Sequence, residues 1–333
     1  MSGAAPDGLV EVVVPGALGD QRVDRVLSIL TGVSRRAAAD AVAAGSVWVD
    51  GDPVRARSTV LRAGQRLRAE LPAEPAPGPV ADRGVAFGVL HADDDLIVVD
   101  KPAGLVVHAG AGHAHGTLVD GLLARFPDLA GLPERVGGDP ARPGIVHRLD
   151  KGTSGLLVVA RSPDAFRSLS AQFRRHEAER RYVALFAGLV GEERGVVEAP
   201  VGRSTRRPDR MAVTPAGRAA RTEYAVEGRF AEPVPATLVE ARLDTGRTHQ
   251  IRVHFAAIGH PVVGDDRYGG EAARPPALVA LLGGGRLFLH ARSLRIGHPD
   301  GRSLTFESPL PADLRAALSA MLPVQPLGEA QVD

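Results

Sequence analysis

The 333-residue sequence contains no cysteine and no asparagine, and only two of its 40 basic residues are lysine. Without cysteine, the chain cannot form disulfide bonds, thiol nucleophiles or cysteine-bound zinc and iron–sulfur centres. No apolar run approaches the roughly 20 residues that cross a bilayer. The first residues also lack the basic-then-apolar layout of a signal peptide. The sequence therefore predicts a cytoplasmic protein without a membrane partner.

Composition leaves the class of partner open. The 40 basic and 39 acidic residues give a net charge of +1, and 44% of the residues are apolar. Both values are typical of a globular protein, and the length predicts two domains at roughly 100–200 residues each. The two lysines, Lys101 and Lys151, both stand near glycine in polar motifs, which makes them candidates for a functional role.

A segment rich in proline, alanine and glycine at 73–84 is predicted to be a linker. It separates a small domain at 12–72 from a larger one at 85–322, which is followed by a flexible tail at 323–333. In the small domain, apolar spacing predicts a helix that ends at Gly32. A second helix, capped by Ser34, is predicted to follow it. The rest of the domain is predicted to form short strands.

Basic residues exceed acidic ones by nine to five between positions 21 and 72. Arg35 and Arg36 fall in the first turn of the second helix, beside free backbone N–H groups, where they suit a phosphate group. On charge alone, an ordinary solvated face explains them equally well. The order of the elements resembles the S4 RNA-binding domain, which implies that Arg35 and Arg36 belong to a surface that binds structured RNA.

The larger domain is predicted to be α+β, with a mixed and largely antiparallel sheet, because its strands do not alternate regularly with helices. Two strands are expected around the acidic turn at 93–95, and a helix at 116–126. A further helix from 163 is expected to give way to a strand near Tyr182. On pattern alone, Tyr182 is expected to be an ordinary half-buried residue of that strand.

Two polar clusters interrupt apolar segments of this domain. The first, at 147–155, is predicted to be a turn between two strands, with Arg148 and Asp150 on the same face. The second, at 245–254, is predicted to include a strand that buries Ile251 and directs Arg252 toward the opposite face. Both patterns also occur in ordinary strands with one solvated face.

The sequence predicts no metal site and no nucleotide cofactor. Three histidines, at 108, 113 and 115, lie in a loop without carboxylates at ligand spacing, and HExxH is absent. The acidic triplet at 93–95 is expected to be a solvated turn. Walker, dinucleotide-binding and GxSxG motifs are absent too.

Four motifs together resemble the RluA-type RNA pseudouridine synthases. They are ADDDLIVVDKPAGLVVHAG (92–110), IVHRLDKGTSGLLVVARS (145–162), TGRTHQIRVHFAAIGHPVVGDDRYG (245–269), and LFLHARSLRIGHP (287–299) followed by FESPLP. They occur in the order typical of the family and span about 85–322. Within the family the chain is most similar to the branch of the large-subunit synthase D.

The resemblance implies that Asp150 is the catalytic aspartate, and that Arg252 favours its ionised form. Tyr182 would stack on the flipped base, Arg148 would hold the nucleotide, and Ile251 would pack near the base. The implied reaction requires no cofactor and no metal. The implied partner is structured RNA, above all large-subunit ribosomal RNA or ribosome precursors, bound by a monomer.

The sequence leaves several alternatives open. A covalent intermediate on the sugar and a glycal intermediate both suit the residues, and the target uridines, in ribosomal or transfer RNA, cannot be identified. A non-catalytic RNA-binding factor on the same scaffold is the second hypothesis, although Asp150, Tyr182 and Arg252 are all present. A nucleoside hydrolase is the third, and the RNA-binding domain argues against so small a substrate.

Overall fold

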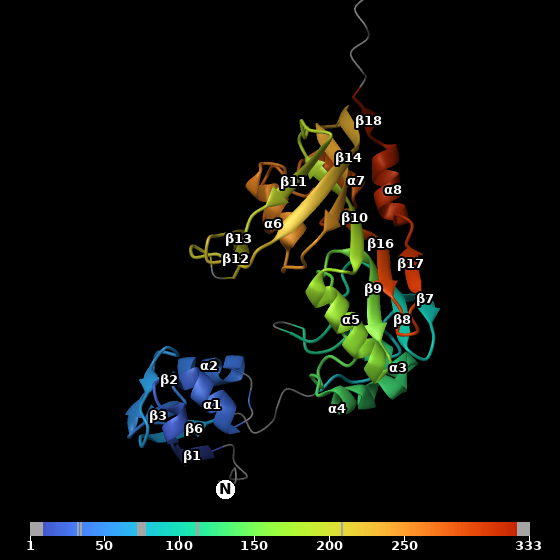
Figure 1. Ribbon diagram of the computed structural model, residues 1–333. Helices are drawn as coiled ribbons and strands as arrows, with labels where there is room; N and C mark the ends of the chain where they lie inside the picture. Colours follow the sequence, from blue (N-terminus) through green and yellow to red (C-terminus); the bar gives the residue numbers. More distant parts are fainter. Residues whose placement is uncertain are drawn as a thin grey trace, which may run out of the picture. The chain divides into compact units, whose positions relative to one another are not determined.

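The computed structural model describes residues 9–31, 33, 35–71, 78–110, 113–207 and 209–324, and the backbone but not the side chain of Arg36. The chain forms two compact units, Met1–Gly78 and Pro79–Asp333 (Figure 1). The expected roles of Gly32, Ser34 and the Arg36 side chain lie outside the described residues. Residues 73–77 of the expected linker and residues 325–333 of the expected tail lie outside them too.

The first unit packs two helices against a small sheet. The predicted helices are confirmed as α1 (Val23–Thr31) and α2 (Arg35–Ala43), which contact each other. The four-stranded sheet has the order β1 (Leu9–Val13), β6 (Arg66–Glu70), β3 (Val47–Val49) and β4 (Asp52–Pro53). A 3-10 turn at Gly16–Leu18 and the paired strands β2 (Gln21–Arg22) and β5 (Val60–Leu61) complete the unit. Strand β1 was not predicted, and it begins ahead of the expected domain start at residue 12.

The second unit is built on a ten-stranded sheet. Its main path has the order β11 (Arg194–Glu198), β14 (Arg221–Glu232), β15 (Ala236–Leu243), β10 (Glu179–Ala187), β16 (Leu289–Gly297), β9 (Ser154–Ala160), β8 (Leu96–Lys101) and β7 (Gly88–Ala92). Strand β17 (Ser303–Glu307) pairs with β16, and β18 (Leu322–Pro323) pairs with β14. A separate hairpin consists of β12 (Val201–Arg203) and β13 (Met211–Val213).

Among the described strands, only β9 and β16 pair in parallel, so the predicted mixed and largely antiparallel sheet is confirmed. At this junction Gly155 has a φ of +108°, and a Cβ atom there would lie 2.3 Å from the carbonyl oxygen of Ala291. Glycine is therefore the residue that allows the two strands to pair immediately after the 147–153 loop.

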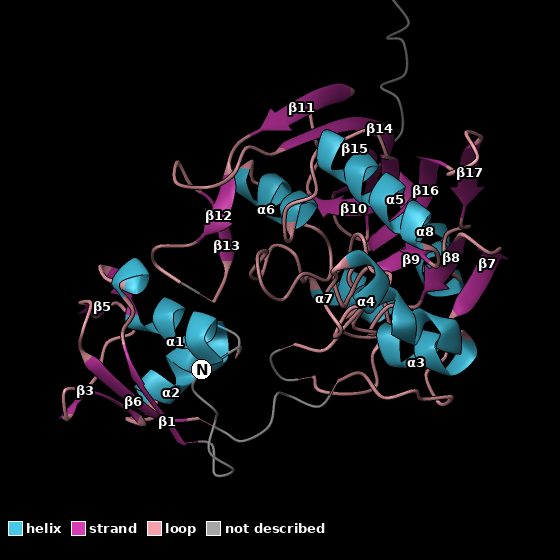
Figure 2. Cartoon of the chain, turned by 60° about the horizontal axis from the view of Figure 1, so that its bottom comes forward, coloured by secondary structure: helices cyan, strands magenta, loops and turns pink. Residues whose placement is uncertain are grey.

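Helices pack against both faces of this sheet, and Figure 2 shows them in cyan among the magenta strands. They are α3 (Leu118–Arg125), α4 (Leu132–Val136), α5 (Pro163–Arg175), α6 (Gln250–Ala257), α7 (Pro276–Leu281) and α8 (Ala312–Ser319), with a 3-10 turn at Pro127–Gly131. Helix α5 contacts β9 and β16, whereas α7 and α8 contact each other. The predicted helix at 116–126 is confirmed as α3, which Thr117 caps through a hydrogen bond from the Asp120 amide.

Strand β10 is buried on both faces, and this fixes the direction of Tyr182. Alternate residues of a strand point to opposite faces. Tyr182 and Phe186 join the core beside α3 and α5, whereas Val183 and Leu185 join a second core beside α7 and α8. The expected helix-to-strand change before Tyr182 is confirmed, but Tyr182 is only 6% exposed and not half-buried.

Two local predictions were wrong. The segment expected to be a strand through Ile251 and Arg252 is helix α6, in which residues 250 to 255 are all buried, so period-two alternation does not describe it. The segment before Asp150 is not a named strand. It has a single bridge, between Ile145 and Val159, and only the strand after the loop forms, as β9.

Candidate active site

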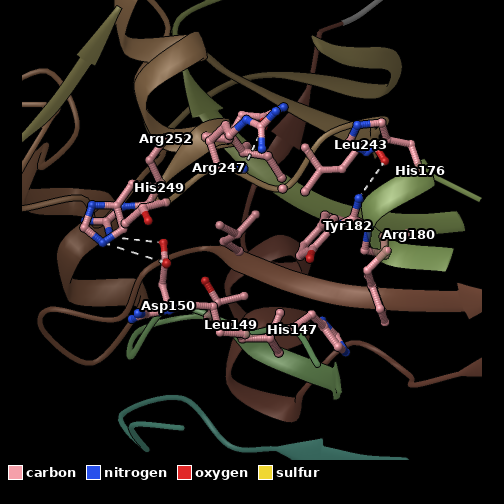
Figure 3. Close-up of a pocket in the computed structure, with 18 of the residues that line it drawn as sticks. His147, Leu149, Asp150, His176, Arg180, Tyr182, Leu243, Arg247, His249 and Arg252 are labelled. Atoms are coloured by element: carbon pink, nitrogen blue, oxygen red, sulfur yellow. Dashed lines mark hydrogen bonds and ion pairs between the residues drawn. The ribbon is translucent and has the colours of Figure 1, made fainter. Parts of the chain in front are cut away.

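The polar clusters meet in a cavity of about 280 Å³. It is bounded by the 147–153 loop, strand β10, the 246–249 loop and the start of α6. Five residues singled out in the sequence line it, namely Arg148, Asp150, Tyr182, Ile251 and Arg252. Figure 3 shows Asp150, His249 and Arg252 at one side of the cavity, and Arg180, Tyr182 and Leu243 at the other. Arg35 and Arg36 belong to the first unit.

The Asp150 carboxylate faces two nitrogen-bearing side chains. Its Oδ2 atom accepts a hydrogen bond from Nη1 of Arg252 at 3.4 Å, and its Oδ1 atom lies 3.8 Å from Nε2 of His249. The Asp150 side chain is 15% exposed, so it is accessible from the cavity. The charge of Arg252 therefore faces the Asp150 carboxylate directly.

Arg252 is held mainly by Asp265. Nε and Nη2 of Arg252 donate to the two carboxylate oxygens of Asp265 at 2.7 and 2.9 Å, a bidentate pair. Burial alone would lower the pKa of Arg252. The charges of Asp265 and Asp150 have the larger effect, so the pKa lies above its ordinary value. The Arg252 guanidinium therefore stays charged and fixed in direction.

His249 connects Asp150 to Tyr268. Its backbone has a φ of +59°, and its Nδ1 atom lies 2.5 Å from the Tyr268 hydroxyl, whose oxygen accepts from the Met211 amide at 3.2 Å. Burial lowers the pKa of His249, and Arg252 adds to this effect against the opposing charge of Asp150. A neutral His249 that accepts from Tyr268 carries its proton on Nε2, toward Asp150.

Gln250 and Lys101 fix the two loops that carry the site. The Gln250 amide donates to the Arg221 carbonyl and to Thr222, and its oxygen accepts from Thr245. Lys101 is fully buried, and its ammonium donates to the carbonyl oxygens of three residues, Pro102, Leu105 and Lys151. Burial lowers the pKa of Lys101 to about 7. The Lys101–Lys151 contact ties the 102–105 turn to the residue after Asp150.

Tyr182 and Arg148 offer different chemistry to the cavity. Burial raises the pKa of Tyr182, so its phenol stays protonated at neutral pH. Arg148 is exposed, whereas Ile251 is buried against the cavity wall. The cavity thus presents the carboxyl group of Asp150, a neutral phenol and an apolar wall.

Sequence reasoning missed Asp265, His249 and Arg180 as members of the site. Asp265 and His249 stand inside the 245–269 motif, and Arg180 stands two residues before Tyr182. The signal for Asp265 and His249 was their position within this motif, because no spacing rule pairs residue 265 with residue 252 across the end of a helix. The signal for Arg180 was its closeness to Tyr182.

Two further findings concern metals and membranes. Within the described residues, no group of three or more histidine, aspartate or glutamate side chains is arranged to hold a metal ion. No helix in the described part of the chain has the length and apolar character needed to cross a membrane.

Comparison with known proteins identifies the class. Residues 95–257 match the model of the RNA pseudouridylate synthase family. An uncharacterised RNA pseudouridine synthase of Mycobacterium tuberculosis is 42% identical over 312 residues, which cover 92% of this chain and 96% of that protein. The chain therefore belongs to the RNA pseudouridine synthase family and is an enzyme that isomerises uridine in RNA, as its motifs predicted.

More particular relatives carry a substrate in their names. The ribosomal large subunit pseudouridine synthase D of Xanthomonas campestris is 40% identical over 94% of this chain and 92% of its own length. The protein of the same name from Pseudomonas aeruginosa is 39% identical over 92% of this chain and 94% of its own length. A solved structure, human RNA pseudouridylate synthase domain containing 1, is 28% identical, with a TM-score of 0.56 over 73% of this chain and 92% of that one.

Proposed function

We propose that this enzyme converts specific uridines of large-subunit ribosomal RNA to pseudouridine, acting as a cytoplasmic monomer with Asp150 as the catalytic carboxylate. The observation that carries the proposal is the Asp150 carboxylate, 3.4 Å from Arg252 and in one cavity with Tyr182. The names of the synthase D relatives support the choice of RNA.

The reaction breaks the bond between N1 of uracil and C1′ of ribose, and forms a bond between C5 and C1′. Asp150 either attacks C1′, forming a C1′–O bond that breaks again when C5 bonds to C1′, or removes a sugar proton and returns it when C5 bonds to C1′. Only the ionised carboxylate does either. Arg252, fixed by Asp265, directs its remaining nitrogen at this carboxylate. After the base has turned, the proton on C5 is lost and N1 gains one, so substrate and product are isomers.

A uridine inside folded RNA must leave its stack before it reaches this cavity. We assign Tyr182 to stacking on the extruded base, and Ile251 to packing beside it, since both are buried in the cavity wall. Arg148 is exposed at the same cavity, which suits a residue that holds the nucleotide during extrusion.

Tyr182→Phe is expected to keep the fold, because the ring continues to pack in the core beside α5. If the phenol takes part in proton transfer, turnover falls by roughly 10²-fold or more, the usual contribution of a general acid or base. Single-turnover assays on target RNA would measure this loss, with thermal unfolding as the control. Turnover within a fewfold of wild type would limit Tyr182 to stacking.

The first unit is proposed to be an S4-like RNA-binding domain that brings the enzyme to structured RNA. Its two adjacent helices and following strands support this assignment. The Arg35 side chain is 59% exposed and lies 3.7 Å from the carboxylate of Asp24, which Arg22 also contacts at 2.9 Å. Arg35 is thus available to a phosphate without leaving Asp24 unpaired.

Arg35→Ala is expected to weaken RNA binding most at low salt, because a phosphate contact releases counterions. The slope of log Kd against log salt should fall by roughly 0.7–0.9 for one lost contact. Filter binding at several salt concentrations measures the slope, and Arg302→Ala, which removes an exposed arginine paired with Asp300, is the matched control. RNA affinity that does not respond to salt would contradict an electrostatic role for Arg35.

The test of function is pseudouridine mapping of total RNA after deletion of the gene, with add-back of wild type and of Asp150→Asn. We expect specific large-subunit uridines to lose modification and only wild type to restore it. If pseudouridine were lost only from transfer RNA, the substrate would be transfer RNA and not ribosomal RNA. An unchanged map would contradict the proposed substrate, and sequencing of crosslinked RNA would then identify what the protein binds.

A further inference from the structure

Arg180 is a buried cation that has no acidic partner among the described residues. It is 7% exposed and lines the active-site cavity. Its guanidinium donates one hydrogen bond, from Nη2 to the Leu243 carbonyl at 3.4 Å, and its Nε atom has no partner. Arg252, in the same cavity, instead has two carboxylate partners. Among the described residues no carboxylate lies within ion-pair distance of this guanidinium, and Asp244 favours its charge only from further away. A largely buried guanidinium without a direct counter-charge is costly.

The surroundings of Arg180 keep this charge in place without neutralising it. Its guanidinium lies 5.5 Å from the centre of the Phe173 ring, on which His147 stacks. Burial lowers the pKa of His147 to about 3, and the charge of Arg180 adds to the effect, so this neighbour is neutral. Gly246 leaves the space: a Cβ atom there would lie 2.6 Å from Nη1 of Arg180. The site is built around the guanidinium.

The whole cavity carries a positive excess, although the chain as a whole is nearly neutral. Asp150 is the sole acidic residue among the described residues that line it. Six arginines line the same cavity, namely Arg148, Arg174, Arg180, Arg218, Arg247 and Arg252. Arg252 is already neutralised by Asp265 and Asp150, so the unbalanced charge belongs to the other five.

We propose that the Arg180 end of the cavity is an anion subsite that takes a backbone phosphate of the RNA strand carrying the target uridine. Uracil and ribose are uncharged, so phosphate is the group of a nucleotide that supplies the missing counter-charge. A guanidinium fork suits a phosphate because it offers two parallel donors. The identity of the anion as RNA rests on the proposed function, whereas the existence of the subsite does not.

The subsite also divides the cavity by chemistry. In Figure 3, Arg180 and Asp150 lie on opposite sides of the cavity, with Tyr182 beside Arg180. A phosphate bound at Arg180 keeps the negative charge of the nucleotide away from the Asp150 carboxylate, which must approach the sugar. Arg180 is therefore a positioning residue that selects one orientation of the nucleotide.

The experiment compares the full-length wild type with Arg180→Met, Arg180→Lys and the surface control Arg302→Met. Thermal unfolding is followed with and without inorganic phosphate, and RNA affinity is measured at several salt concentrations. Wild type and Arg302→Met should gain Tm with phosphate, and Arg180→Met should not. Without phosphate, Arg180→Met should unfold at or above the Tm of wild type, because methionine removes an uncompensated charge.

The salt dependence of RNA affinity is the second measurement. The slope of log Kd against log salt should fall by about 0.7 in Arg180→Met, as expected for one lost phosphate on a single strand. Arg180→Lys should keep the charge and the slope, and bind RNA more weakly because it lacks the fork. If Arg180→Met does not fold, Arg180→Lys still tests the fork, and RNA affinity equal to wild type would count against the subsite.

The outcomes separate the subsite from the proposed function. A lower Tm in Arg180→Met, with an unchanged phosphate response and an unchanged salt slope, would show that Arg180 is only structural and overturn the subsite. A lost phosphate response with an unchanged RNA slope would overturn the assignment of the anion to RNA. The phosphate titration requires no turnover, so it reports on Arg180 even if the proposed substrate is wrong.

Discussion

We expect Asp150→Asn to abolish pseudouridine formation, with a loss of roughly 10⁴-fold or more in the single-turnover rate. Losses of this size are typical when the group that attacks or removes a proton is replaced by one that does neither. The amide has nearly the same volume as the carboxylate and still accepts a hydrogen bond from Arg252. We therefore expect the fold and most of the RNA affinity to survive.

The measurement combines tritium release from C5-labelled RNA with RNA binding and thermal unfolding of the same preparations. Asp94→Asn is the matched control, since Asp94 is exposed in the turn between β7 and β8. Turnover by Asp150→Asn at even a tenth of the wild-type rate would remove Asp150 from the chemistry. A variant that is inactive because it unfolds would show itself by a lost thermal transition.

Asp265→Asn is expected to have the largest effect on stability. The Asp265 side chain is completely buried and forms both hydrogen bonds of the pair with Arg252. Removing one partner of a buried pair leaves the other charge uncompensated and costs about 3–5 kcal/mol in the free energy of unfolding. Asp150 continues to face Arg252, so we expect the lower end of this range, together with a slower chemical step.

The contribution of the Asp265–Arg252 pair to stability should also depend on pH. Burial opposes ionisation of Asp265, but Arg252 and two backbone amides lower its pKa below the ordinary value. A carboxyl whose pKa is lower in the folded protein stabilises it above the unfolded pKa of about 3.9, and loses this contribution as pH falls through the folded pKa. Denaturant unfolding at pH 7 and below 4 should therefore show wild type and Asp265→Asn converging in acid.

Asp266→Asn is the control for both measurements, because Asp266 is the exposed neighbour of Asp265. It should match wild type at each pH. If Asp265→Asn were as stable as Asp266→Asn at pH 7, the pair with Arg252 would contribute nothing to stability, and the role of Asp265 would be limited to orienting the guanidinium.

Much of the fold followed from local patterns. Apolar spacing located α1, and helices were also predicted where α2, α3 and α5 form, with a change to a strand near Tyr182, where β10 forms. Helix α6 was not predicted, because all of its first six residues are buried. This burial removes the amphipathic stripe that marks a helix. The alternation of Ile251 and Arg252 then imitated a strand. A tertiary environment that buries every face of a segment cannot be detected from periodicity.

The site was only partly predictable, for a similar reason. The family resemblance implied Asp150, Tyr182 and Arg252 as site residues, and these three line one cavity. Asp265 and Arg180 became apparent only from contacts, since the first is recognised by its pairing with Arg252 and the second by the absence of such a pairing. A charge at a given position has no functional meaning until its neighbours are known.

The parallel pairing of β9 with β16 has a consequence for how the chain is made. Ser154 and His290, which pair across this junction, are separated by 136 residues. At roughly 5–20 residues per second, β9 waits on the order of ten seconds on the ribosome for its second neighbour. All seven residues of β9 are buried in the finished enzyme, so during this interval an apolar strand has an open edge and is prone to aggregate. When β16 emerges it closes that edge, and its Leu289 completes the wall of the cavity, so the nascent enzyme gains protection and its active site in one step.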